Sequence, residues 1–306
     1  MLRQVRVFAP GSIGNVGPGL DILGLAVAGL GDVVTAERSE ESGVIIDEPG
    51  HPALPTDAAR HTSGIAAAEV LFRAGARFGL RLRIEKGLPL CGGQGGSAAS
   101  AVAGAVAANL LLNDPLPSRT LLLAALEAEA RVSGRHADNV APILLGGLVL
   151  IQSLDPLEVI RLPVPAALRL VLAHPDRSMP TRKARAVLPS TIPLQVALHQ
   201  AAQVGAIVAA AHSGDLKVLG RAIDDRIAEP ARAPLLEGFR EAKQAALAAG
   251  ALGCSISGSG PTVFAMVESD RVGVRVAEAM SQAYDRLGIA CGTRIAGPDL
   301  EGARRL

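Results

Sequence analysis

Residues 87–97 read GLPLCGGQGGS, and five of the first ten residues are glycine. Glycine has no Cβ, so clustered glycines let backbone N–H groups converge on one point. Ser97 opens a run of small residues that predicts a helix to about Leu112. The free N–H groups and the dipole at a helix N-terminus favour an anion. The stretch therefore predicts a phosphate-binding loop, and the alternative is a flexible loop capped by Ser97.

Two well-known phosphate loops fit this stretch poorly. A Walker loop ends in Gly-Lys-Ser or Gly-Lys-Thr, and residues 95–97 contain no lysine. A dinucleotide fingerprint is present in form as Gly93-x-Gly95-x-x-Ala98, but residues 87–92 separate it from the preceding strand. The acid expected about 20 residues later would be Asp114, which lies in a turn between predicted helices. An NAD-dependent oxidoreductase is therefore disfavoured, and NAD binding would test it.

Composition limits the remaining classes of function. The chain has 306 residues, 49% of them hydrophobic, and a net charge of +1, which favours about two folded domains. This small charge, with one Tyr, five Phe and no Trp, does not favour a nucleic-acid or membrane partner. Three scattered cysteines predict neither a disulfide framework nor a zinc site. We expect a cytoplasmic protein with no apolar run clean enough for a membrane helix.

Strands and helices interleave along the chain without a regular βαβ rhythm, which favours the α+β class. Hydrophobic patterning predicts strands at 5–9, 20–30, 33–37, 80–85, 146–153, 168–173, 254–257, 262–267 and 291–295. It predicts helices at 58–78, 97–112, 118–131, 181–188, 194–213, 215–224, 232–249 and 270–287. The three prolines in Asp155–Pro165 mark a boundary between domains at 1–160 and 161–306.

Four segments, taken together, resemble the signatures of the GHMP small-molecule kinases. Residues 15–24, NVGPGLDILG, are similar to the first signature, residues 89–100, PLCGGQGGSAAS, to the second, and residues 257–264, SGSGPTVF, to the third. Residues 133–142, SGRHADNVAP, resemble a segment close to particular to the branch of the family that phosphorylates homoserine. The segments follow the family's order and span nearly the whole chain.

The resemblance implies the GHMP kinase fold and a reaction. The N-terminal domain would resemble the second domain of ribosomal protein S5, and the C-terminal domain would be ferredoxin-like, with ATP between them. The implied reaction uses ATP and Mg²⁺ to phosphorylate the side-chain hydroxyl of homoserine in threonine biosynthesis. A homodimer is a further family expectation. The alternatives are a sister GHMP kinase acting on another hydroxylated metabolite, and a binding or regulatory homologue without turnover.

The second signature implies the nucleotide site. The residues it assigns to ATP are Pro89, Leu90, Cys91, Gly92, Gly93, Gln94, Gly95, Gly96, Ser97, Ala98 and Ala99. Ser97 and Glu129 match the family's two magnesium positions, and oxygen ligands of this kind suit Mg²⁺. Glu127, two residues away, is the rival for Glu129. Ser97, Glu129 and Asn139 form the expected catalytic set, without a general base, because metal and helix-dipole stabilisation can suffice.

The resemblance also implies the residues that bind the amino acid. Arg185 and Arg232 match two carboxylate-binding arginines, and arginine suits such a role because it pairs with a carboxylate through two hydrogen bonds. A polar lining would come from Asn15, Asp21, His136, Asp138 and Asn139, the last three on a loop after a helix. Asp21 and Asp138 are candidates for the ammonium group, and Asn139 is the candidate for the hydroxyl.

Four positions depart from the family pattern. Gly96 stands where a serine is usual, and Gln94 replaces an apolar residue. His61 stands where relatives often have Asn near the adenine, and Leu20 stands where Phe is common. These departures leave nucleotide affinity and preference open.

Overall fold

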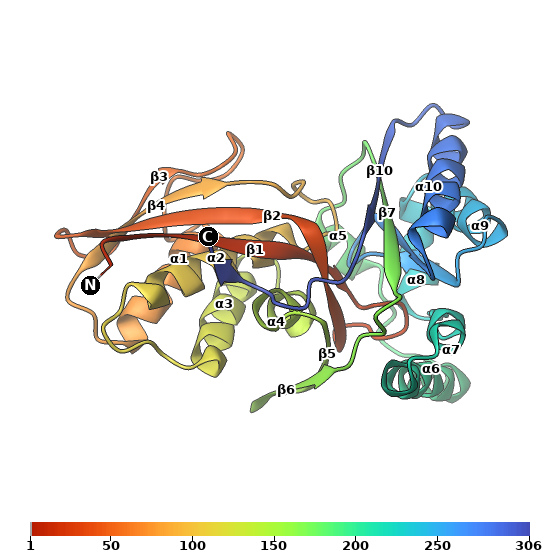
Figure 1. The fold of residues 1–306 in the computed structure, drawn as a ribbon, viewed down its shortest axis with the longest axis horizontal. Helices are drawn as coiled ribbons and strands as arrows, with labels where there is room; N and C mark the ends of the chain where they lie inside the picture. Colours follow the sequence, from red (N-terminus) through yellow and green to blue (C-terminus); the bar gives the residue numbers. More distant parts are fainter. Residues whose placement is uncertain (1) are drawn as a thin grey trace.

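The first half of the chain forms a sheet around two long antiparallel strands in the computed structural model, which describes residues 2–306. The sheet runs β11-β1-β2-β4-β3, and β5 pairs with β2 and β6. Helices α1 to α4 cover one face of it (Figure 1). The strands are β1 (Gln4–Gly14), β2 (Leu23–Ser39), β3 (Val44–Glu48), β4 (Gly79–Glu85), β5 (Leu148–Leu154), β6 (Leu157–Leu162) and β11 (Arg304–Arg305). The helices are α1 (Thr62–Arg73), α2 (Gly96–Leu110), α3 (Ser118–Val132) and α4 (Ala137–Leu145).

The second half forms a separate four-stranded antiparallel sheet in the order β10-β7-β9-β8. Its strands are β7 (Arg169–Pro175), β8 (Gly253–Ile256), β9 (Val263–Val267) and β10 (Cys291–Ala296). Helices α9 (Phe239–Ala248) and α10 (Asp270–Asp285) pack on one face (Figure 1). The remaining helices are α5 (Thr181–Ala186), α6 (Leu194–Ser213), α7 (Leu216–Arg221), α8 (Ala228–Arg232) and the 3-10 turn η1 (Ala233–Leu235).

A shared apolar cluster joins the two halves. It includes Ile13 and Leu23 from the first sheet and Leu170, Ile207 and Phe264 from the second half. Burial of large side chains on both sides stabilises this contact, at about 25 cal/mol per Å² of apolar surface removed from water. Val16, just after β1, belongs to this cluster, and the glycine-rich segment after β4 accepts hydrogen bonds from Ser257 and Thr262, so both lie where the two halves meet.

The structure confirms the α+β class and corrects several predicted elements. β2 is one continuous strand rather than two, and β1 extends to Gly14, beyond the strand predicted at 5–9. The helix predicted at 232–249 is divided, because η1 ends at Leu235 and α9 begins at Phe239. Gly238, with a left-handed φ of 80°, is the N-cap of α9. β3, β6, β11, α4 and α8 were not predicted. The polar start of α4 and its internal Pro142 hid its helical pattern.

The expected boundary segment, Asp155–Pro165, contains β6, which pairs with β5 in the first sheet. The chain passes to the second sheet between Leu162 and Arg169, and β11 returns at the end to pair with β1. The division at residue 160 stays a prediction.

Helix α6 is by length and composition apolar enough to cross a membrane, with a mean hydropathy of 1.3 over its most apolar window. The expectation that no run meets this criterion is therefore wrong, because α6 contains no Asp, Glu, Lys or Arg.

Candidate active site

The carbonyl groups of the glycine-rich loop point into the surrounding protein. Four successive carbonyls, from Cys91 to Gln94, accept hydrogen bonds from other segments. Cys91 O accepts from Met179 N (3.1 Å), and Gly92 O accepts from Thr262 Oγ1 (2.5 Å). Gly93 O accepts from Ser257 Oγ (2.7 Å), and Gln94 O accepts from Ser12 N (3.0 Å). In a planar trans peptide the N–H points opposite to the C=O. The N–H groups of residues 92–95 therefore face away from these donors, as a phosphate cradle requires.

Gly95, not Ser97, is the N-cap of α2. Its φ of 71° is left-handed, and a Cβ there would lie 2.2 Å from Ser12 Oγ. The helix begins at Gly96, and no side chain caps it. The alternative of a loop capped by Ser97 is therefore wrong. The first-turn N–H groups of α2 add their partial positive charge to the cradle.

The Ser97 hydroxyl instead donates to Glu129 Oε2 at 3.1 Å. Glu129 lies on α3, is 7% exposed and also accepts a hydrogen bond from Ser133 Oγ at 2.7 Å. Its other oxygen, Oε1, is buried and has no hydrogen-bond partner among residues 2–306. Burial raises the pKa of Glu129, against the effect of the two serine hydroxyls and the positive charge of Lys86.

The unpartnered oxygen of Glu129 fits a cation. A buried acceptor without a donor is costly, and a divalent ion would satisfy it. Among the described residues no group of three His, Cys, Asp or Glu side chains could hold a metal alone. Mg²⁺ suits this arrangement because it binds through one or two protein oxygens together with phosphate and water. The rival Glu127 is instead half-exposed and pairs with Arg131 at 3.2 Å.

Lys86 and Asp32 form a buried ion pair behind the loop, which the sequence analysis missed. Lys86 Nζ also donates to Gly96 O (2.8 Å) and Ser100 Oγ (3.0 Å), whereas Asp32 Oδ1 accepts from the backbone at the start of the loop. The pair thus joins both ends of the loop. The sequence did contain a sign of this role, because Lys86 is one of only four lysines in the chain and directly precedes the glycine-rich segment.

The residues expected to bind an amino acid converge where the two halves meet. Arg185 on α5 forms a bidentate ion pair with Asp21, with Nη1 at 2.8 Å from Oδ2. Burial raises the pKa of Asp21, but the hydrogen bond and charge of Arg185 outweigh it, so this pKa lies below its usual value. Arg185 Nε is buried without an acceptor among residues 2–306. Its free N–H fits one oxygen of a ligand carboxylate.

Arg232 lies beside this pair and is 3% exposed. Its Nε donates to Ala184 O (3.2 Å) and its Nη1 to Gly258 O (2.8 Å), so backbone carbonyls hold the guanidinium in place. Burial and the neighbouring charge of Arg185 lower the pKa of Arg232. Two guanidinium groups close together favour an anionic ligand.

Asn15 and Asp21 adopt left-handed backbone conformations, with φ of 67° and 64°, which are uncommon for residues other than glycine. Asn15 N donates to Asp138 Oδ2 at 3.0 Å, and Asn15 Oδ1 accepts from Asp21 N at 3.1 Å. Asn15 Nδ2 also donates to Gly258 O at 3.0 Å. These hydrogen bonds hold a strained turn, as is common at binding sites.

Asp138 and Asn139 lie in the first turn of α4 rather than on the expected loop, and His136 is its N-cap. Burial, and then the negative charge of Asp21, raise the pKa of Asp138 to about 7. His136 Nδ1 lies 3.5 Å from Asp21 Oδ1, and burial lowers the pKa of this histidine.

Asn139 connects the two groups of residues. Its Oδ1 accepts from Ser12 Oγ at 2.8 Å and would lie 3.2 Å from a Cβ on Gly95. Its Nδ2 lies 3.4 Å from Asp138 Oδ1. The structure therefore brings the glycine-rich loop and the residues expected to bind an amino acid to adjoining places. His61 caps α1 by accepting from Ser63 N at 3.2 Å, and the charges of Lys86 and Asp32 behind the loop act on its ring.

Comparison with known proteins agrees with this arrangement. The model of the GHMP kinases N terminal domain matches residues 62–147, and that of the GHMP kinases C terminal matches residues 207–286. The chain belongs to the GHMP kinase family, and the family implies ATP as a substrate.

Within that family the chain groups with the homoserine kinases. It is 45% identical over 294 residues to the homoserine kinase of Arabidopsis thaliana, covering 93% of this chain and 80% of that one. Identity to the homoserine kinase of Chlorobium phaeobacteroides is 42% over 296 residues, covering 92% of each. The crystal structure of homoserine kinase from Cytophaga hutchinsonii superposes with a TM-score of 0.96 at 41% identity, covering 100% of this chain and 98% of that one.

Proposed function

We propose that the enzyme transfers the terminal phosphoryl group of ATP to the side-chain hydroxyl of homoserine, with Mg²⁺, in threonine biosynthesis. The observation that carries the proposal is a pair of unsatisfied buried atoms. Glu129 Oε1 lacks a positive partner beside the phosphate loop, and Arg185 Nε lacks a negative partner among the residues assigned to the amino acid. A magnesium nucleotide and an amino-acid carboxylate would satisfy one each.

Each group of residues has a role in this reaction. The N–H groups of residues 92–98 bind the phosphates, and Arg185 with Arg232 binds the carboxylate of homoserine. Asp138 and Asp21 attract its ammonium group, and Asn139 orients its hydroxyl toward the phosphate loop. Ser97 and Glu129 would hold Mg²⁺, which neutralises charge on the transferred phosphoryl group.

The residues contribute mainly by position and charge. The homoserine oxygen forms a bond to the terminal phosphorus, the bond from that phosphorus to the bridging oxygen of ADP breaks, and the hydroxyl proton is released. No general base is assigned. Holding the two substrates in adjoining places removes the entropic cost of their encounter, and fixed donors stabilise the developing charge.

The family resemblance also supports a cytoplasmic location and a homodimer, and both stay predictions.

A comparison of substrates tests the reaction. ADP release should be rapid with homoserine and ATP, and slow with threonine, serine and mevalonate, because only homoserine combines both charges with a primary hydroxyl at the γ carbon. A coupled ADP-release assay measures this. Faster release with another alcohol would favour a sister GHMP kinase. ATP binding without ADP release on any of them would favour a binding homologue.

The raised pKa of Asp138 predicts a pH dependence of homoserine binding. Below pH 7 its carboxyl is mostly protonated and attracts the ammonium group weakly, whereas above pH 7 it is ionised. The KM for homoserine should therefore fall by up to about tenfold from pH 6 to pH 8. Asp21 stays ionised over this range because its pKa lies below its usual value, and burial lowers the pKa of His136. Steady-state kinetics on Asp138→Asn should give a flat profile, and an unchanged slope would refute the assignment.

A further inference from the structure

A charged side chain from the second half of the chain contacts the phosphate loop. Arg294 on β10 donates from Nη2 to Gln94 Oε1 at 3.3 Å and from Nη1 to Ala28 O at 3.0 Å. No acidic residue among residues 2–306 forms an ion pair with it. Both partners of the guanidinium are neutral oxygens, so its positive charge is not cancelled locally.

Gln94 is connected to the loop backbone through hydrogen bonds that involve Thr262. Its Nε2 donates to Thr262 Oγ1 at 3.2 Å, and Thr262 Oγ1 donates to Gly92 O at 2.5 Å. A threonine hydroxyl has one proton and two acceptor positions. Because the proton goes to Gly92, the hydroxyl accepts from Gln94 and from His174 Nδ1, which lies 2.9 Å away. Gln94 and Thr262 are 5% and 0% exposed, so water does not compete for these bonds.

The hydrogen bonds therefore run in one direction, from the Arg294 guanidinium through Gln94 and Thr262 to the carbonyl of Gly92. Hydrogen bonds in such a chain polarise one another, and a charged donor at the start strengthens the effect. The last acceptor belongs to the Gly92–Gly93 peptide, whose N–H points to the opposite side. Polarisation of this peptide makes the Gly93 N–H a better donor on the cradle side.

We propose that Arg294 is a positioning residue for ATP, acting through Gln94 and Thr262 on the Gly92–Gly93 peptide. The inference rests on the proposed function, because it assumes that the loop binds a triphosphate. Gln94 is central to it. An apolar residue at this position would interrupt the chain of hydrogen bonds and leave the guanidinium without one of its two acceptors.

The test measures binding of a non-hydrolysable ATP analogue to the full-length protein by calorimetry. Arg294→Met should raise the Kd for the analogue about tenfold, because a charge-assisted donor is lost. Gln94→Leu should have a similar effect. The double variant should bind about as well as either single variant, because both substitutions break the same chain. In Arg294→Met the kcat at saturating ATP and the KM for homoserine should stay within about twofold, since Arg294 contacts none of the residues assigned to the amino acid.

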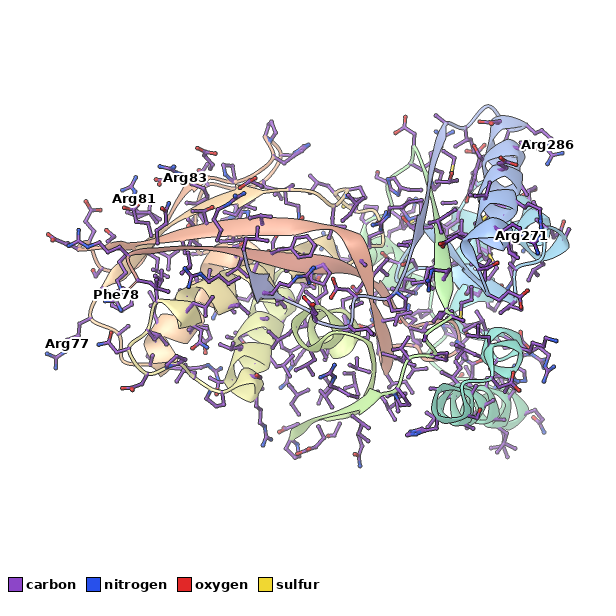
Figure 2. All side chains as sticks on the ribbon, viewed as in Figure 1. Arg77, Phe78, Arg81, Arg83, Arg271 and Arg286 are labelled. Carbon is purple, nitrogen blue, oxygen red and sulfur yellow. The ribbon has the colours of Figure 1, made fainter. Side chains whose placement is uncertain are left out.

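Arg271→Met is the matched control. Arg271 lies at the exposed start of α10 in the same half of the chain, and Figure 2 labels its side chain on that helix. Its loss removes the same charge without touching the loop, so the Kd should change by less than about twofold. If Arg294→Met does not fold, as thermal melting would show, Gln94→Leu still tests the proposal without removing a charge.

Three outcomes overturn the inference. The first is an unchanged Kd in Arg294→Met and Gln94→Leu while the unaltered protein binds the analogue, which would leave the proposed function intact. The second is additive effects in the double variant. The third is failure of the unaltered protein to bind the analogue, which would overturn the proposed function as well.

Discussion

Glu129→Gln should lower kcat by about a hundredfold or more and raise the Mg²⁺ concentration needed for half-maximal rate. The amide has nearly the same shape as the carboxylate, but it lacks the charge that would hold Mg²⁺. It could still accept a hydrogen bond from Ser97, which now reaches Glu129 Oε2 at 3.1 Å. Affinity for ATP without metal should change little, because the N–H groups of the loop remain. Initial rates at varied Mg²⁺ and fixed ATP would show both effects.

The control lies on the same helix. Glu127 has the same charge, but it is half-exposed and pairs with Arg131 one turn away. Glu127→Gln should therefore stay within about twofold of the unaltered enzyme. Equal rates for both variants would contradict the magnesium assignment, and so would a loss in Glu127→Gln alone.

Arg185→Met should raise the KM for homoserine about a hundredfold and leave the KM for ATP unchanged. Each hydrogen bond to a charged partner contributes about 1.5–3 kcal/mol, and about 1.4 kcal/mol corresponds to a tenfold change in affinity. Methionine keeps much of the apolar stem but removes the unpaired Nε donor and the partner of Asp21. Kinetics with each substrate varied in turn would separate the two KM values.

Arg182→Met supplies the control, because Arg182 lies on the same short helix but is exposed. Loss of Arg185 also leaves Asp21 without its ion-pair partner, so Asp21→Asn is combined with Arg185→Met to remove that secondary cost. A homoserine KM that returns to normal in the double variant would mean that Arg185 only neutralises Asp21. A KM well above that of Asp21→Asn alone, which itself loses a contact with the ammonium group, would support direct binding by Arg185.

The sequence predicted the elements of the fold better than it predicted contacts between them. The small-residue helix after the glycines and the strands that were predicted in both sheets are present, because local patterning specifies them, whereas β3, β6 and β11 were missed. Helix α4 was missed, since Pro142 and two polar residues in its first turn resemble a loop. The Asp32–Lys86 ion pair joins residues 54 positions apart, and no local pattern shows such a pairing.

The choice between Glu127 and Glu129 was available in the sequence. Leu122, Ala125 and Leu126 are buried on α3, and Glu129 follows them by seven, four and three residues, on the same face. Glu127 lies off that face and is only half-buried. The match to a family position and the helical spacing therefore both favour Glu129 over Glu127. By contrast, Arg294 lies 200 residues from Gln94, and no local pattern in the sequence predicts their contact.

A crystal structure with Mg²⁺, homoserine and a non-hydrolysable ATP analogue is the most direct test. We expect the triphosphate on the backbone of residues 92–98, the metal at Ser97 and Glu129, and the amino-acid carboxylate on Arg185 and Arg232. The homoserine hydroxyl should face the terminal phosphate beside Asn139. A nucleotide bound at another place, with the glycine-rich turn empty, would contradict the account of how this chain works.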